Sequence, residues 1–159
     1  MTVSDLSDYF ENYATKHKLL LHATDKPTFF CMNTEKNTEE FIRNNPLDIV
    51  LILLVPDKDL NKSHDNYSWL RNCAFMVLKR MADATNASKV DGQNIAEIIC
   101  NDFTRKIIAD RTILLSSIED NGYSMHPVGP MGDNHYGYMT LFRQVDTFDW
   151  EDQGDNWNP

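Results

Sequence analysis

Most of the short motifs that identify an enzyme are missing from this 159-residue sequence. There is no G-x-S-x-G, no phosphate-binding loop, no G-x-G-x-x-G, no H-E-x-x-H and no C-x-x-C. The longest apolar run, DIVLILLVP at 48–56, is too short to cross a membrane. The opening MTVSDLSDYF has neither the basic start nor the apolar core of an export signal. We therefore expect a protein that is not an enzyme, needs no cofactor and does not enter a membrane.

Cysteine is scarce, and the three that occur, Cys31, Cys73 and Cys100, are odd in number and far apart. Small secreted proteins that depend on disulfides usually carry an even, denser set. We therefore predict three unpaired thiols, mostly buried as small core residues.

Positive charge is also in short supply, with 15 Lys and Arg against 24 Asp and Glu. An acidic surface does not displace counterions from the phosphates of nucleic acid. We therefore expect no direct, sequence-specific binding to nucleic acid. The excess negative charge keeps a protein soluble, and it also suits a surface past which DNA must slide.

Hydrophobic periodicity predicts the elements of the first half. An amphipathic helix is expected over 2–21, capped by Thr2 with Asp5 three residues on. A short strand over 27–33 and one or two helical turns over 37–46 follow. The run at 48–55 is apolar throughout and predicts a strand covered on both faces. A polar loop is expected over 56–66.

The hydrophobic pattern of 67–84 fits both a helix and a strand. A helical stripe and an alternating strand face describe it equally well, and we favour the strand because aromatic residues dominate its first half. A long helix is expected over 88–111, starting at Ser88 with Asp91, and its apolar stripe comprises Ile95, Ile98, Ile99, Phe103, Ile107 and Ile108.

The last third predicts antiparallel strands. Two strands joined by an Asn-Gly turn are expected over 112–130, and a final strand over 135–148. The sequence therefore indicates an α+β fold: a largely antiparallel sheet packed by an N-terminal helix and a longer central helix. We expect one domain, 1–145, followed by a C-terminal arm, 146–159.

Two patterns in the sequence contain residue types that bind metals. Asp57, Asp59, Asn61, Ser63 and Asp65 alternate like calcium ligands, but Lys62 and Ser68 occupy the glycine and glutamate positions of an EF-hand. His126 and His135 flank a turn that contains Asp133, and we expect them to be solvent-facing hairpin residues. No metal site is predicted from either pattern.

The acidic arm carries three aromatic side chains, Phe148, Trp150 and Trp157. Tryptophan is over-represented as an interface anchor, whereas a purely solvating tail is poor in aromatics. One interpretation is that the last strand leaves the edge of the sheet and that the arm docks on a neighbouring subunit through these residues. The other is that the tryptophans fold back onto their own domain, and the sequence leaves both open.

Several segments carry a family resemblance: TVSDLSDYFENYATKH, DIVLILL, AFMVLKRMAD, IAEIICNDFTRKIIAD and NHYGYMTLFRQVDTF. By the order of these segments, the chain resembles a group of small tail-assembly proteins, the tail-terminator and neck proteins, from bacteriophages that infect Bacteroidetes-type hosts. The resemblance implies a subunit of a homo-oligomeric ring, usually a hexamer, that caps the tail tube and joins it to the head connector. The location it implies is the virion, assembled in the host cytoplasm.

An acidic binding module, such as an immunity or antitoxin-like protein that neutralises a basic partner, fits the size and charge equally well. Oligomeric state distinguishes the two, because a terminator forms rings, at least on the tail, whereas an immunity protein is a monomer or dimer in a one-to-one complex.

Overall fold

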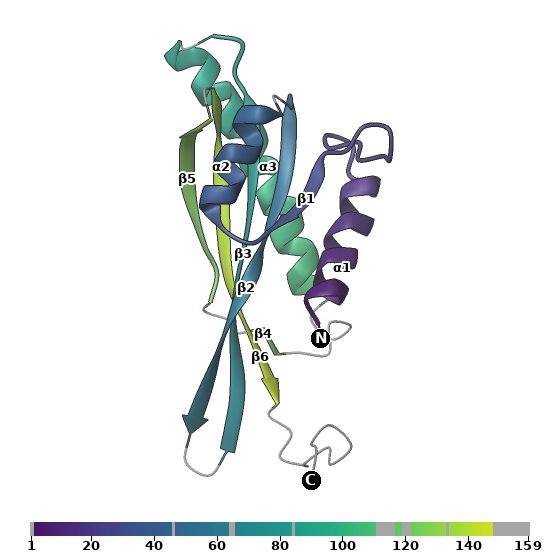
Figure 1. Cartoon of the computed structure of the whole chain (residues 1–159), viewed down its shortest axis with the longest axis vertical. Coiled ribbons are helices and arrows are strands. Elements are labelled where there is room, and N and C mark those ends of the chain that lie inside the picture. Colours follow the sequence, from purple (N-terminus) through teal and green to yellow (C-terminus); the bar gives the residue numbers. More distant parts are fainter. Residues whose placement is uncertain are drawn as a thin grey trace.

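The computed structural model describes residues 2–45, 47–63, 66–83, 85–110, 117–118, 122–132 and 134–147. Three helices and six strands follow one another along these residues (Figure 1). In chain order they are α1 (Val3–Lys16), β1 (Phe29–Met32), α2 (Glu35–Asn44), β2 (Ile49–Ser63), β3 (Asn66–Arg80), α3 (Asn86–Ala109), β4 (Ser117–Ile118), β5 (Ser124–Met131) and β6 (His135–Thr147).

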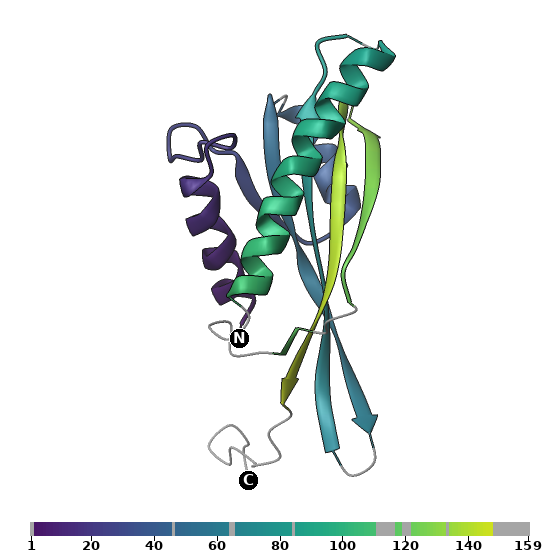
Figure 2. The ribbon, with the colours of Figure 1, turned by 180° about the vertical axis from the view of Figure 1, so that it is seen from behind.

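The described strands form one six-stranded sheet in the order β1-β2-β3-β6-β4, with β5 also paired to β6. Only the β1–β2 pair is parallel, and every other pair is antiparallel. Helices α1 and α3 cover one face of the sheet, and α2 lies on the other (Figures 1 and 2). The predicted α+β class, with its largely antiparallel sheet, is confirmed.

The fully buried run of β2 divides its side chains between two cores. Leu51 and Leu53 join the core beneath α1 and α3, whereas Val50 and Ile52 join the core beneath α2. Alternation along a strand sends successive side chains to opposite faces, so an apolar run without interruption requires cover on both sides. This confirms the predicted buried strand.

Helix α1 starts as expected but ends early. The Thr2 hydroxyl accepts from the Asp5 N–H, and the Asp5 carboxylate accepts from the Thr2 N–H, which completes a capping box. The helix ends at Lys16, and a turn follows in which Leu20 is buried and Leu21 has a φ of 50°. The predicted extension to residue 21 is wrong, because apolar spacing does not distinguish a packed turn from a further turn of helix.

The ambiguous segment 67–84 is the strand β3, as favoured. Its odd-numbered side chains Cys73, Phe75 and Val77 enter the first core, and Met76 and Leu78 enter the second. The predicted loop over 56–66 is wrong. Strand β2 runs on to Ser63 and β3 starts at Asn66, so the described residues of this range belong to two long, paired strands.

Helix α3 begins at Asn86, with Thr85 as its N-cap, rather than at Ser88. The Thr85 hydroxyl accepts a hydrogen bond from the Ser88 N–H at 3.3 Å. The buried stripe is narrower than predicted, since Ile98 is 52% and Ile108 44% exposed. It comprises Gly92, Ala96, Ile99, Cys100, Phe103 and Ile107.

Candidate functional site

The feature that extends furthest from the body of the domain is the end of the β2–β3 hairpin, here called the distal hairpin (57–63 and 66–72). It runs past the ends of α1 and α3, and in both ribbon views no helix of the described chain lies against it (Figures 1 and 2). Strand β1 pairs with β2 only as far as Leu54. Beyond that residue, no described strand pairs with the outer edge of β2. Such an edge is a surface where another chain can dock.

A register shift between Leu54 and Asp57 sets which way the side chains of the distal hairpin face. Beyond it, Lys58 pairs with Arg71 and Leu60 pairs with Trp69. Because Cys73 and Phe75 of β3 face the core beneath α1 and α3, their odd-numbered neighbours and the residues paired with them lie on that face. Leu60 and Trp69 are therefore on the α1 and α3 side.

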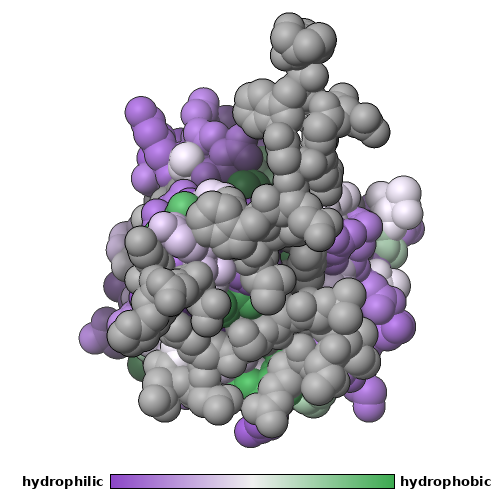
Figure 3. Space-filling model, turned by 90° about the horizontal axis from the view of Figure 1, so that it is seen from below, coloured by the Kyte–Doolittle hydropathy of each residue, from purple (hydrophilic) through white to green (hydrophobic). Residues whose placement is uncertain are grey.

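Leu60 is the apolar residue that the distal hairpin exposes most, at 48%. The Lys58 ammonium lies 4.5 Å from the centroid of the Trp69 ring, a cation–π geometry that holds the indole beside it. Seen from the hairpin end, hydrophilic residues lie around the edge of the described surface, and some hydrophobic areas show within it (Figure 3). Leu60 and Trp69 are directly paired across the two strands and thus form an apolar contact point on the distal hairpin.

The distal hairpin is fixed to the body of the domain by a buried ion pair. Arg71 Nη2 lies 3.0 Å from Asp146 Oδ2, and the two side chains are only 7% and 15% exposed. Strand β6 pairs with β3 from Ser68 to Arg80, so the base of the hairpin is three strands wide. A lone two-stranded ribbon is marginal in water, and this third strand makes the projection rigid.

On the opposite face, where the cover of α2 ends, the sheet carries a groove of about 580 Å³. Its floor is one row across three strands, in which Leu54 pairs with Ala74 and Ala74 with Leu141. Leu141 is 37% exposed. The remaining lining residues are mostly polar: Asn33, Thr34, Val55, Asp57, Asn72, Cys73, Gly122, Ser124, Phe142 and Arg143. Arg143 Nε donates to Asn72 Oδ1 at 3.3 Å, which fixes one side of the rim.

The predicted interface residues Phe148, Trp150 and Trp157 lie outside the described residues. The structure does correct one part of that interpretation. Strand β6 is not at an edge of the sheet, because it pairs with β3 on one side and with β4 and β5 on the other. Asp146, placed in the arm by sequence, belongs to β6 through its pairing with Trp69.

The two histidines that flank the predicted turn do not come together. His135 is buried, at 3% exposed, and its Nε2 lies 2.8 Å from the carbonyl oxygen of Leu47. The expectation that it faces solvent is therefore wrong. His126 is exposed and pairs with Met139 in the register of β5 and β6. Asp133 lies outside the described residues.

The alternating polar residues of 57–63 lie in strand β2 and not in a loop. Asp57, Asp59 and Asn61 share one face of β2, and Asn72 donates to Asp59 Oδ2 at 3.2 Å. His64 and Asp65 lie outside the described residues. Within the described ranges, no group of three or more His, Cys, Asp or Glu side chains is placed to hold a metal.

All three cysteines are free, as predicted, but only two are buried. Burial raises the pKa of Cys73 and of Cys100 to about 12, so both thiols stay protonated at neutral pH. Cys31 is exposed, and the prediction of burial is wrong for it. It lies on β1, the edge strand, whose outward-facing positions have less cover.

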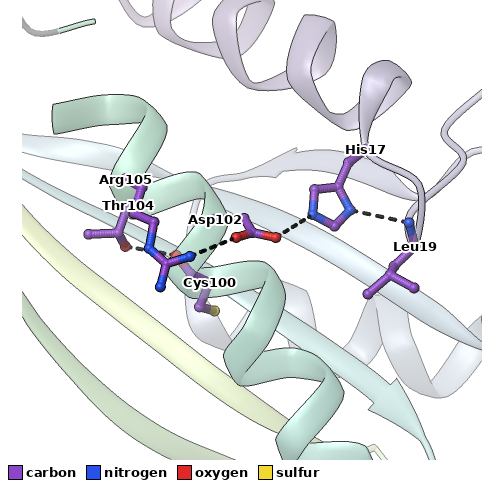
Figure 4. A network of polar contacts seen from close by, with 6 residues as sticks. All are labelled: His17, Leu19, Cys100, Asp102, Thr104 and Arg105. Carbon is purple, nitrogen blue, oxygen red and sulfur yellow. Dashed lines mark hydrogen bonds and ion pairs between the residues drawn. The ribbon is translucent and has the colours of Figure 1, made fainter. Parts of the chain in front are cut away.

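Polar contacts join α1 to α3. His17 Nε2 lies 3.4 Å from Asp102 Oδ2, and Arg105 donates to Asp102 Oδ1 at 3.4 Å (Figure 4). Near the end of α3, the Asp110 carboxylate accepts from the Tyr13 hydroxyl at 2.8 Å and from the Tyr9 hydroxyl at 3.2 Å. These contacts orient the two helices. Tyr13, His17 and Asp102 also line a small groove of about 180 Å³.

Comparisons of the chain with protein-family models, with curated proteins and with solved structures find no match. No helix in the described ranges has the length and apolar character that a membrane span requires. On the described surface of the domain, the distal hairpin and the groove are the two features that suit contact with another protein.

Proposed function

We propose that the protein is a structural subunit of a bacteriophage tail or neck that assembles into a closed ring, as tail terminators do. The distal hairpin is the observation that carries the proposal. It projects from a domain whose two cores are already complete, it is held rigidly by Arg71 and Asp146, and it exposes Leu60 together with an open strand edge. A rigid projection of this kind serves contact between chains, and no described part of the domain depends on it for cover.

The ring would cap the tail tube and join it to the head connector, and its location would be the virion. The net charge of −9 supports this role, because a negative lumen lets DNA pass without the counterion release that drives binding.

A shortened hairpin tests the proposal. Residues 59–70 are replaced by an Asn-Gly turn, which keeps Arg71 and its partner Asp146. The full chain is expected to sediment as a closed oligomer over a range of concentrations, whereas the shortened chain should remain a monomer that keeps its helical circular dichroism signal and unfolds cooperatively on heating. A full chain that stays monomeric at every concentration contradicts the proposal, as does a shortened chain that assembles equally well.

A further inference from the structure

We infer that the groove of one copy receives the distal hairpin of a second copy, with Leu60 as the buried anchor. The inference rests on the proposed ring and names the interface that would build it. Both surfaces belong to described residues, and each leaves a large apolar side chain partly exposed, Leu60 at 48% and Leu141 at 37%.

The groove is hollow because of a small residue between two large ones. Ala74 lies between Leu54 and Leu141 in the row that crosses β2, β3 and β6, and its methyl group leaves the space above it open. An apolar floor with a polar rim is typical of a binding surface. A volume of about 580 Å³ is sufficient for a leucine together with part of an indole ring.

The distal hairpin offers a side chain of matching kind. Leu60 is 48% exposed, and the Trp69 ring beside it is held by Lys58. Anchors at protein interfaces are commonly one or two large side chains that enter a pocket while polar neighbours exclude water. The rim of the groove carries the Asp57 carboxylate, which would attract Lys58 next to Leu60, and the Arg143 guanidinium, whose Nε donates to Asn72. Such local complementarity matters for a chain whose net charge of −9 opposes self-association.

Geometry excludes the chain's own hairpin as the occupant, so a hairpin in the groove must come from another copy in a head-to-tail arrangement. Leu60 lies on the α1 and α3 side of the sheet, whereas the floor residues Ala74 and Leu141 lie on the α2 side. A chain cannot bring a side chain of one face into a recess on the other face of its own rigid sheet. Two different surfaces in contact make a heterologous interface, which repeats from copy to copy until the rotation closes a ring.

Two variants disable the two surfaces separately. Leu60→Asp alters the hairpin and leaves the groove intact, and Leu141→Asp alters the groove and leaves the hairpin intact. Both positions are partly exposed, so a carboxylate is tolerated by the fold. Leu19→Asp is the matched control, because Leu19 is 47% exposed and lies in the turn after α1, away from both surfaces. Each test variant should weaken self-association at least tenfold, and the control should assemble as the unaltered chain does.

Mixing the variants gives the decisive result. One intact hairpin and one intact groove remain in an equimolar mixture of Leu60→Asp and Leu141→Asp, so the mixture should form dimers that cannot grow, visible as a two-chain mass by sedimentation velocity. Mixtures that stay monomeric overturn the inference, and so do single variants that still form the full oligomer. If the single variants still form the full oligomer, the proposed ring stands and only the proposed interface is refuted. If the unaltered chain never assembles, the proposed function is refuted.

Disulfide trapping identifies the occupant directly. Chains with Leu60→Cys and chains with Leu141→Cys, each also carrying Cys31→Ser, should form a mixed disulfide on mild oxidation. A pair of Leu19→Cys and Leu141→Cys should not. Within one chain the two positions lie on opposite faces and are several residues apart along the strands, well beyond the roughly 7 Å limit between Cα atoms for a disulfide. If Leu141→Cys is trapped by Trp157→Cys and not by Leu60→Cys, the C-terminal segment fills the groove and the inference is wrong.

Discussion

The guanidinium of Arg71 and the carboxylate of Asp146 lie 3.0 Å apart, and both side chains are largely removed from solvent. Their contact joins β3 to the end of β6 at the base of the distal hairpin. A buried pair of this kind costs desolvation when it forms, so its net contribution is modest. Losing one partner is far more costly, because the other charge then remains buried without compensation.

The first prediction follows from that asymmetry. Asp146→Asn should lower the free energy of unfolding by about 3 kcal/mol, measured by urea denaturation. The control is Glu39→Gln, which removes an ion pair with Arg43 at the same 3.0 Å, but with side chains 58% and 49% exposed. It should cost no more than about 0.5 kcal/mol. Equal small effects for both variants would show that Arg71 is solvated and that the hairpin base is not held by this pair.

The second prediction concerns Gly137, where β6 passes closest to β3. A Cβ atom there would lie 1.8 Å from the carbonyl oxygen of Val77, a backbone atom that cannot move alone. Gly137→Ala should therefore destabilise the fold by about 2–3 kcal/mol. At Gly92 the Cβ would meet only the flexible end of the Met81 side chain, and alanine has the higher helix propensity. Gly92→Ala should be milder by at least 1 kcal/mol in the same thermal melts, and a reversed order would contradict the strand packing.

The third prediction concerns pH. Burial alone would raise the pKa of Asp110, but hydrogen bonds from Tyr13, Lys106 and Tyr9 outweigh it, and the pKa is lowered from its ordinary value of 3.8. A lowered pKa in the folded state means that the stabilisation is complete above the ordinary value. It is lost as the pH falls through the folded-state pKa.

Asp110→Asn should accordingly cost about 2 kcal/mol at neutral pH, since it weakens hydrogen bonds made to a charged acceptor. The difference from the unaltered chain should shrink as the pH falls below about 4. Urea midpoints measured from pH 7 to pH 2 check this. A difference that stays constant over the whole range would mean that the Asp110 carboxylate contributes nothing that depends on its charge.

The fourth prediction concerns the C-terminal arm. Because Asp146 and Thr147 belong to β6, a truncation should follow Thr147. The truncated chain should fold but assemble poorly. The double variant Trp150→Ala and Trp157→Ala should reproduce most of that defect, because large apolar rings contribute more binding energy than exposed ion pairs do. Asp149→Asn, Glu151→Gln and Asp152→Asn together should mainly change the salt dependence. If the truncated chain assembles as the full chain does, the arm serves only to keep the protein soluble.

The sequence predicts the core of this fold better than its projection. The strand at 48–55 was identifiable because burial on both faces leaves an apolar run, and β3 was identifiable from its aromatic first half. The distal hairpin was missed because an exposed ribbon buries little, so nothing selects apolar residues there. The alternation of Asp57, Asp59 and Asn61 that suggested calcium ligands is the period of a strand.

The candidate groove had no signal in the sequence. It depends on Leu54, Ala74 and Leu141 meeting in one row, and they come from three strands that are paired in one regular register at this row. Spacing along the chain does not give that register. The exposed face of α3 was missed for a related reason, because Ile98 and Ile108 fit a helical apolar stripe without being covered by the sheet.

The central claim is that this protein closes a ring at the head-proximal end of a phage tail. Electron microscopy of particles assembled with and without its gene tests it most directly. With the gene present, the protein should be found in a ring between tail tube and head connector. Without it, heads and tails should stay unjoined, or tubes should have uncontrolled length. Normal, joined particles that lack the protein would contradict the account.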